Sequence, residues 1–220
     1  IGLIVFMIIL SVLDMFYECQ DLNLVCIYVF IVGIIATFII SFNILLFLNW
    51  VTVLKKRYES LNSFLQKHSS TPKMEGEAQM NRITSISDSQ IHTLRIVFIH
   101  LYDVANTINS VFGLFLLAFT SFSLVNVLCS ITWFMYKYNG LLNYFQTFSW
   151  CSISIVSLLA ISVVCAMTVH ECARSPIIVQ RILARKDLGH DMIDKLEKLF
   201  VQLNAMKIEF TACGMFNIDL

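Results

Sequence analysis

Charged side chains are scarce in this sequence, and the two signs are balanced. Only 14% of the 220 residues are charged, with 15 basic and 15 acidic side chains and no net charge. This balance gives no reason to expect nucleic-acid binding. Proline is rare too, with 2 residues, so the apolar segments can form long helices. Because short alternating polar and apolar segments are missing, we do not expect a porin-like barrel.

Clustered cysteines and enzyme motifs are also missing. The 7 cysteines are scattered, with no C-x-x-C pair and no cysteine and histidine cluster at metal-ligand spacing, which predicts no metal and no cofactor. Cys19 and Cys26 flank a predicted external loop, where either a disulfide or two unpaired apolar cysteines fits. Without a nucleophile elbow, an H-E-x-x-H motif, a P-loop or paired intramembrane carboxylates, we expect no enzyme.

Hydrophobic residues dominate what remains. They make up 58% of the chain, and the mean hydropathy is +0.77, which is too apolar for one soluble core. Apolar stretches cover residues 1–13, 24–50, 107–136 and 145–169, and the last three exceed the roughly 20 residues needed to cross a bilayer. We therefore predict an all-α, polytopic membrane protein. The first stretch has no basic flank of a signal peptide, so we expect it to be part of a further helix.

The basic residues predict the orientation of these helices. Residues 51–106 carry seven of the 15 basic side chains, residues 171–220 carry seven, and Lys137 is the remaining one. Because basic residues are retained on the cytoplasmic side, both long polar segments are expected inside. The almost complete lack of charge in the membrane stretches argues against an ion-coupled transporter, which keeps ionisable groups near the midplane.

The two cytoplasmic segments are predicted to contain helices. Residues 68–89 look like a flexible linker, and a membrane-proximal helix from Ile91 enters the membrane near Thr107. Glu171 and Arg174 have the i,i+3 spacing of an ion pair. An apolar stripe at helical spacing follows in the tail: Met192, Leu196, Leu199, Leu203, Met206 and Phe210. It predicts a packed cytoplasmic helical anchor layer, although an amphipathic helix of this kind also fits a lipid surface or calmodulin.

The C-terminal run resembles a known family signature. Residues 210–220 read FTACGMFNIDL, similar to the FTACGFF-x-(I/L)-D signature of insect gustatory receptors. The departure is Met215, where that family usually has Phe, and the swap conserves volume. The segment Leu94–Leu117 is similar to the entry to that family's fifth membrane helix, with Leu-Tyr at 101–102, Ile-Asn-Ser at 108–110 and Phe-Gly at 112–113.

The resemblance implies a domain order and a function. Residues 1–50 correspond to a partial third and a fourth membrane helix, 51–106 to the cytoplasmic loop, 107–170 to the fifth and sixth helices, and 171–220 to a cytoplasmic helix and the start of a link to the pore helix. We expect a fragment that lacks this last helix. The implied protein is a plasma-membrane taste receptor subunit, a cation channel gated by sugars or bitter compounds, in a homo- or hetero-tetramer. A secondary transporter or a G-protein-coupled receptor fragment is the alternative.

Candidate site residues follow from the predicted orientation. Polar and aromatic side chains in the outer half of the bundle suit a tastant, because a recognition site needs both apolar faces and hydrogen bonds. They are Tyr28, Asn126, Trp133, Tyr136, Tyr144, Gln146 and Trp150. For each aromatic member taken singly, an interfacial belt is the favoured interpretation. The amides are the stronger candidates, because an amide facing lipid is unfavourable.

The signature supplies the candidate gating link: Thr211, Ala212, Cys213, Gly214, Phe216 and Asp219. Gly214 suits a sharp backbone reversal, and Cys213 suits close packing. Asp219 fits either a cation-attracting ring at the inner mouth of the pore or a helix cap.

Overall fold

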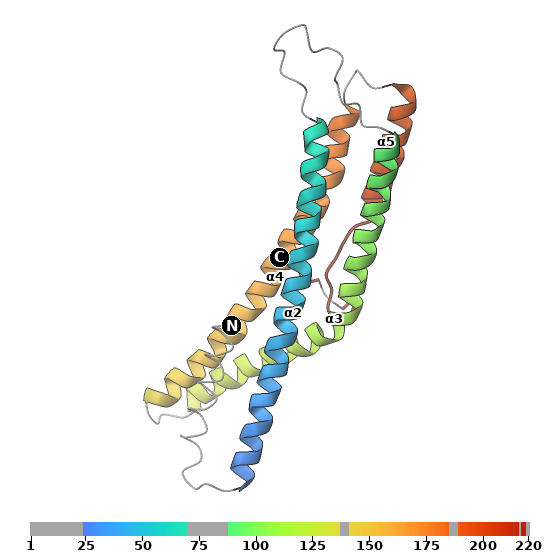
Figure 1. The fold of residues 1–220 in the computed structure, drawn as a ribbon. Coiled ribbons are helices and arrows are strands. Elements are labelled where there is room, and N and C mark those ends of the chain that lie inside the picture. Colours follow the sequence, from blue (N-terminus) through green and yellow to red (C-terminus); the bar gives the residue numbers. More distant parts are fainter. Residues whose placement is uncertain (1–23, 70–87, 137–140, 185–188, 216, 219–220) are drawn as a thin grey trace. The chain divides into compact units, whose positions relative to one another are not determined.

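The protein is all-helical over the part of the chain that the structure describes. The computed structural model describes residues 24–69, 88–136, 141–184, 189–215 and 217–218. Four helices follow one another: α2 (Leu24–Ser69), α3 (Asp88–Tyr136), α4 (Leu141–Leu183) and α5 (His190–Ala205) (Figure 1). Within these ranges the only β pairing is the isolated bridge between Thr211 and Asn217. The predicted fold class is therefore confirmed.

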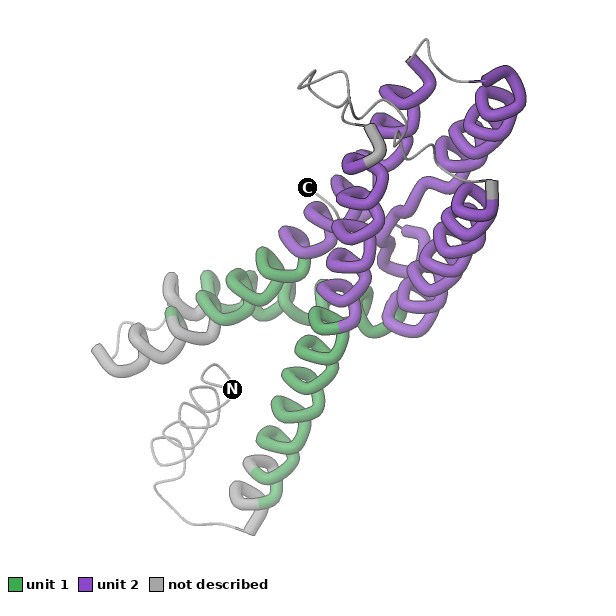
Figure 2. The backbone as a smooth tube through the Cα atoms, turned by 45° about the horizontal axis from the view of Figure 1, so that its top comes forward, with its two compact units in different colours: residues 1–49, 114–161 green, residues 50–113, 162–220 purple. Residues whose placement is uncertain are grey.

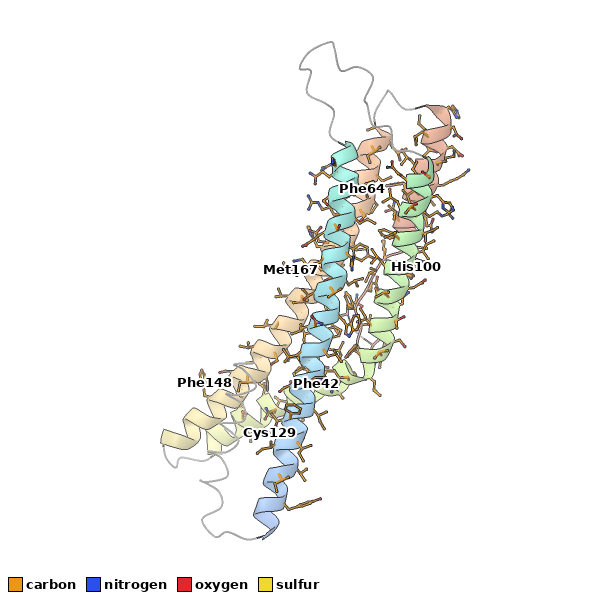
Figure 3. The ribbon with its side chains drawn as sticks, viewed as in Figure 1. Phe42, Phe64, His100, Cys129, Phe148 and Met167 are labelled. Atoms are coloured by element: carbon orange, nitrogen blue, oxygen red, sulfur yellow. The ribbon has the colours of Figure 1, made fainter. Side chains whose placement is uncertain are left out.

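Three of the helices are long and apolar enough to cross a membrane. Among the described residues the spans are Ile31–Lys67, Ser89–Thr132 and Cys151–Leu183, in which only 11%, 22% and 28% of the most apolar window is buried. Large hydrophobic side chains such as Phe42 and Phe148, which are 55% and 72% exposed, stand out along the helices (Figure 3). Water does not tolerate so much continuous apolar surface, so lipid is the solvent of these faces.

The chain divides into two compact units (Figure 2). Unit 1 comprises residues 1–49 and 114–161, and unit 2 comprises residues 50–113 and 162–220. Because α2, α3 and α4 each continue through a unit boundary, every one of them contributes a segment to both units. Unit 2 also contains α5 and the chain that follows it.

A buried polar cluster joins α2 to α4 in the core of unit 2. Asn62 is 3% exposed and Ser175 is fully buried. The Asn62 amide donates to the backbone oxygen of Glu171 at 2.7 Å, and Ser175 Oγ donates to Asn62 Oδ1 at 2.6 Å. Glu171 also pairs with Arg174 at 3.7 Å, which confirms the ion pair expected from their spacing. Every polar group of this cluster therefore has a partner, as burial requires.

Helix α5 is amphipathic, as its sequence predicts. Its buried side chains are Leu196, Leu199 and Leu203, which fall on one helical face. The outer face carries the exposed pairs Lys195–Asp191 and Lys198–Asp194, both at 2.7 Å. The hydrogen bond from Lys198 lowers the pKa of the Asp194 carboxyl. Exposed pairs of this kind contribute little to folding, so the buried leucines hold α5 in unit 2.

The prediction that the helical stripe continues to Phe210 is wrong. Helix α5 ends at Ala205, and residues 206–210 carry no helix assignment. In this segment Ile208 and Phe210 are buried, whereas Lys207 and Glu209 are exposed. That period of two is the pattern of an extended chain with one buried face. Phe210 does reach the core, but it does so from an extended segment.

Candidate functional site

The structure describes only two of the predicted tastant-binding side chains. Tyr28 lies on α2 and is 69% exposed. Asn126 lies on α3 and donates a hydrogen bond to Ser154 of α4. Of the other predicted residues the structure describes the helical backbone and not the side chains, and their role stays a prediction: Trp133, Tyr136, Tyr144, Gln146 and Trp150.

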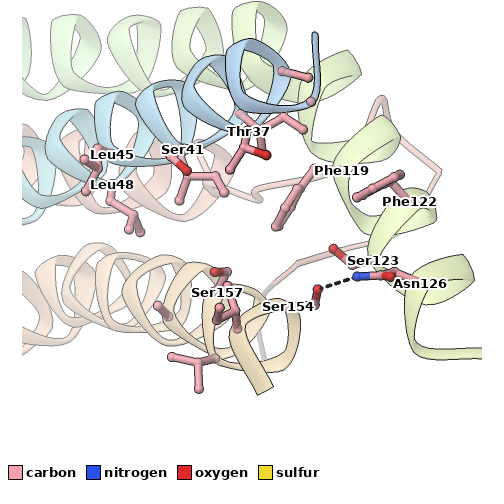
Figure 4. Close-up of a pocket in the computed structure, with 17 residues that line it drawn as sticks. Thr37, Ser41, Leu45, Leu48, Phe119, Phe122, Ser123, Asn126, Ser154 and Ser157 are labelled. Atoms are coloured by element: carbon pink, nitrogen blue, oxygen red, sulfur yellow. Dashed lines mark hydrogen bonds between the residues drawn. The ribbon is translucent and has the colours of Figure 1, made fainter. Parts of the chain in front are cut away.

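Asn126 belongs to the wall of a cavity in unit 1. The cavity has a volume of about 520 Å³ and lies between α2, α3 and α4 (Figure 4). This volume falls within the roughly 300–1,000 Å³ that is usual for small-molecule sites. Aliphatic and aromatic side chains such as Ile44, Leu48 and Phe119 form most of its wall. Among the described residues that line it, none carries a charge.

A minority of the lining side chains are polar, and they come from all three helices. They are Thr37, Ser41, Ser123, Asn126, Ser154 and Ser157. Figure 4 shows Ser123 beside Asn126 on α3, with Ser154 facing them from α4. Asn126 Nδ2 donates to Ser154 Oγ at 3.3 Å, which ties α3 to α4 at this point.

Ser123 differs from its polar neighbours. Its side chain is 1% exposed, and its Oγ has no hydrogen-bond partner among the described residues. Buried hydroxyls normally have a partner, because leaving one unpaired costs free energy. The cavity wall therefore contains a buried hydroxyl oxygen that has no hydrogen-bond partner among the described residues.

The sequence prediction missed the serine and threonine residues of this cavity. Ser123 and Asn126 are spaced i,i+3, as are Ser154 and Ser157, while Thr37 and Ser41 are spaced i,i+4. Such spacings place two polar groups on one helical face. The signal was therefore present in the sequence, but small hydroxyl residues also occur on membrane helices where they bond only to their own backbone.

The signature residues form a hairpin turn that docks on α3 within unit 2. Cys213 and Gly214 have φ angles of 53° and 73°, and Met215 N–H donates to the Ala212 oxygen at 3.0 Å. Positive φ at both central positions is the feature of a type I′ turn. Glycine adopts positive φ without strain. Ile218 N–H then bonds the Phe210 oxygen at 2.8 Å and closes the hairpin.

Asn109 and Gly113 of α3 receive this hairpin. Thr211 N–H donates to Asn109 Oδ1 at 2.9 Å, and Asn109 Nδ2 donates to Thr211 Oγ1 at 3.2 Å. A Cβ at Gly113 would approach the Cys213 nitrogen to 3.2 Å. Asn109 and Gly113 are one helical turn apart and face the same way. The hydrogen bonds of Asn109 and the close backbone approach at Gly113 therefore hold the hairpin on the same face of α3. Of the signature residues, Phe216 and Asp219 lie outside the described residues.

The cysteines and carboxylates that the structure describes give no second site. Cys129, Cys151, Cys165, Cys172 and Cys213 are free thiols. Within the described ranges there is no group of three His, Cys, Asp or Glu residues able to hold a metal ion. Cys19 lies outside those ranges and the side chain of Cys26 is not described, so the disulfide alternative stays open.

Fold and cavity together define a class of protein. Three apolar spans make the chain an α-helical membrane protein, and a partly polar cavity between them suits recognition of a small molecule.

The chain belongs to the 7tm chemosensory receptor family, whose family model matches residues 1–220. Membership agrees with the gustatory-receptor resemblance of its C-terminal signature, and it makes the chain a membrane chemoreceptor. A comparison with curated proteins finds no match.

Proposed function

We propose that this chain is a subunit of a taste receptor, a tastant-gated cation channel of the plasma membrane that detects sugars or bitter compounds. Family membership supports the receptor class, and the signature around Thr211 supports the gustatory branch. The observation that carries the proposal is the cavity of about 520 Å³ between three apolar helices. In this proposal the cavity binds the tastant, and the receptor acts as a homo- or hetero-tetramer joined by its cytoplasmic helices.

Helix α3 offers a route from ligand to gate. It runs unbroken from Asp88 to Tyr136, with Ser123 and Asn126 at the cavity and Asn109 and Gly113 at the hairpin. A tastant shifts a conformational equilibrium only if it binds one state better than the other. In the proposal, the tastant binds one state of the cavity better than the other, and the hairpin is part of the link to the gate.

Filling the cavity tests this function. Ala160 lines the cavity, and its neighbour Leu159 is 52% exposed and does not line it. In cells that express the receptor, we expect Ala160→Phe to weaken tastant-evoked calcium signals at least about tenfold, because one tenfold loss needs only about 1.4 kcal/mol of lost binding. Leu159→Phe adds an aromatic ring one residue away on the outer face, so it should respond like wild type.

Two outcomes would contradict the proposal. Equal responses from Ala160→Phe and the wild type, at equal surface expression, would remove the cavity from tastant detection. Uptake of labelled tastant without any current would instead support the transporter alternative.

A further inference from the structure

The hydroxyl of Ser123 behaves unlike the threonine hydroxyls of α3. Thr107, Thr120 and Thr132 each donate to the carbonyl oxygen four residues earlier, at 2.8, 2.8 and 2.9 Å. This is the usual way in which a membrane helix pairs a hydroxyl when no other partner is present. Ser123 Oγ makes no such bond and no other bond within the described residues, although its side chain is 1% exposed. It therefore lacks the backbone partner that these threonines have.

The remaining wall limits what that partner can be. A charged ligand loses its hydration on entering a cavity whose described lining contains no opposite charge, and this loss is large. A sugar has a hydroxyl on nearly every carbon and needs a partner for each. The described wall is mostly apolar and offers few such partners, and Asn126 and Ser154 already bond each other. A lipid acyl chain or another hydrocarbon would leave Ser123 unpaired.

We infer that the cavity selects an uncharged ligand with an apolar body and one hydrogen-bonding group, which binds Ser123 Oγ. The inference rests on the proposed function, because it takes the cavity as the tastant site, and it narrows the tastant class to lipophilic compounds. The apolar walls from α2 and α4 enclose the ligand body, and the serine fixes its orientation. Phe119, Ile153 and Ser123 are all buried, so the hydrogen bond forms away from water and discriminates well.

The first test measures binding without requiring any current. The full chain is purified in detergent, and its thermal unfolding is followed with thymol, menthol, p-cymene, sucrose or denatonium. Thymol is p-cymene with one added hydroxyl, so this pair isolates the hydrogen bond and controls for partition into detergent. A ligand that binds only the folded state raises the unfolding midpoint. We expect thymol and menthol to raise it most, and sucrose and denatonium to have no effect.

A matched pair of variants tests the role of Ser123. Ser123→Ala removes the unpaired hydroxyl at almost constant volume, so without ligand the variant should unfold at the same temperature as the wild type or higher. Its dissociation constant for thymol should rise roughly 2- to 12-fold, which corresponds to one hydrogen bond, and that for p-cymene should stay unchanged. Thr120→Ala removes a hydroxyl already bonded to its own helix and should bind thymol like wild type.

The outcomes separate this inference from the proposed function. Stronger stabilisation by sucrose or denatonium, no stabilisation by either neutral alcohol, or an equal loss of p-cymene binding in Ser123→Ala would overturn the inference. If the neutral alcohols bind through Ser123 but no compound evokes current in cells, the channel function fails and the ligand class stands. If sugars evoke current and the neutral alcohols do not bind, the channel function stands and the ligand class fails.

Discussion

At the scale of single residues, Asn62 is the polar side chain on which the packing of α2 against α4 depends most. It is buried, donates to the Glu171 backbone and accepts from Ser175. Asn62→Ala leaves the Ser175 hydroxyl and the Glu171 carbonyl without their partner. We expect a loss of roughly 1–3 kcal/mol in the free energy of unfolding, measured by thermal or denaturant unfolding of the purified chain.

Asn43 on the same helix provides the control. Its amide donates to the Ile39 carbonyl of its own helix at 2.8 Å, so Asn43→Ala leaves no partner on another helix unpaired and should change stability by less than about 0.5 kcal/mol. Combining Asn62→Ala with Ser175→Ala should recover part of the loss, because the stranded hydroxyl is then removed as well. Equal losses for Asn62→Ala and Asn43→Ala would contradict the assignment of Asn62 as the link between α2 and α4.

The candidate site was only partly predictable from the residues. Asn126 was predictable, because an amide is unfavourable in lipid and has to face a cavity or another helix. Ser123 was not, since a serine on a membrane helix usually bonds its own backbone, and only the structure reveals that Ser123 does not. Gln146 carries the same physical argument as Asn126, and its place in the site stays a prediction, as does that of Trp150.

At the scale of elements, the docking of the hairpin on α3 depends on the absence of a side chain at Gly113. A Cβ there would lie 3.2 Å from the backbone nitrogen of Cys213, and backbone cannot move aside as a flexible side chain can. Gly113→Val adds two further carbons at this point, so we expect a loss of about 1–3 kcal/mol from overpacking. Gly33→Val is the matched control, because a Cβ at Gly33 meets nothing within 4 Å.

Thermal unfolding of Gly113→Val and Gly33→Val measures the effect. Gly33→Val is a control for stability and not for ligand binding, because Gly33 lines the cavity. Adding Asn109→Ala to Gly113→Val should not restore the lost stability. If it did, the hairpin would not be held against α3 as described. A stability loss confined to Gly113→Val would support close packing of helix and turn.

The segment after α5 illustrates how two periodicities compete in one sequence. Phe210 follows Met206 by four residues, which fits a helix, but residues 206–210 also alternate apolar and charged, which fits an extended chain. The helical interpretation failed because Phe210 is compatible with both patterns. The alternation of Lys207 and Glu209 was the signal that distinguishes them.

A substitution scan of this segment distinguishes the two conformations. Ile208→Ala and Phe210→Ala remove side chains that are 4% and 0% exposed, and each should cost about 2–5 kcal/mol of folding free energy. Lys207→Ala and Glu209→Ala should stay within about 0.5 kcal/mol of the wild type. A scan in which the costs recur every three or four residues, instead of every second one, would favour a helix here.

At the scale of the whole molecule, the fold class followed from composition because a mean hydropathy of +0.77 leaves no soluble alternative. The chain order of helices was predictable for the same reason, since long apolar runs in a bilayer have to be helical. The cavity was not, because its walls come from three helices whose rotation about their own axes depends on packing. Hydrophobic runs without a polar face carry little information about that rotation.

The orientation of the chain is a whole-molecule prediction that labelling can decide. Fourteen of the 15 basic residues fall in segments predicted to lie inside, and retention of basic residues on the cytoplasmic side is the strongest determinant of topology.

Single cysteines are introduced by Glu197→Cys on α5 or Tyr28→Cys on α2, both at exposed positions. The background carries Cys129→Ser, Cys151→Ser and Cys213→Ser, because these native thiols are exposed or half-buried. It also carries Cys19→Ser and Cys26→Ser, because these two residues flank the predicted external loop. A membrane-impermeant maleimide should label the cysteine at position 28 in intact cells and the one at position 197 only after permeabilisation. The background alone should stay unlabelled in both conditions. The reverse pattern would invert the topology and, with it, the proposal that α5 belongs to a cytoplasmic anchor.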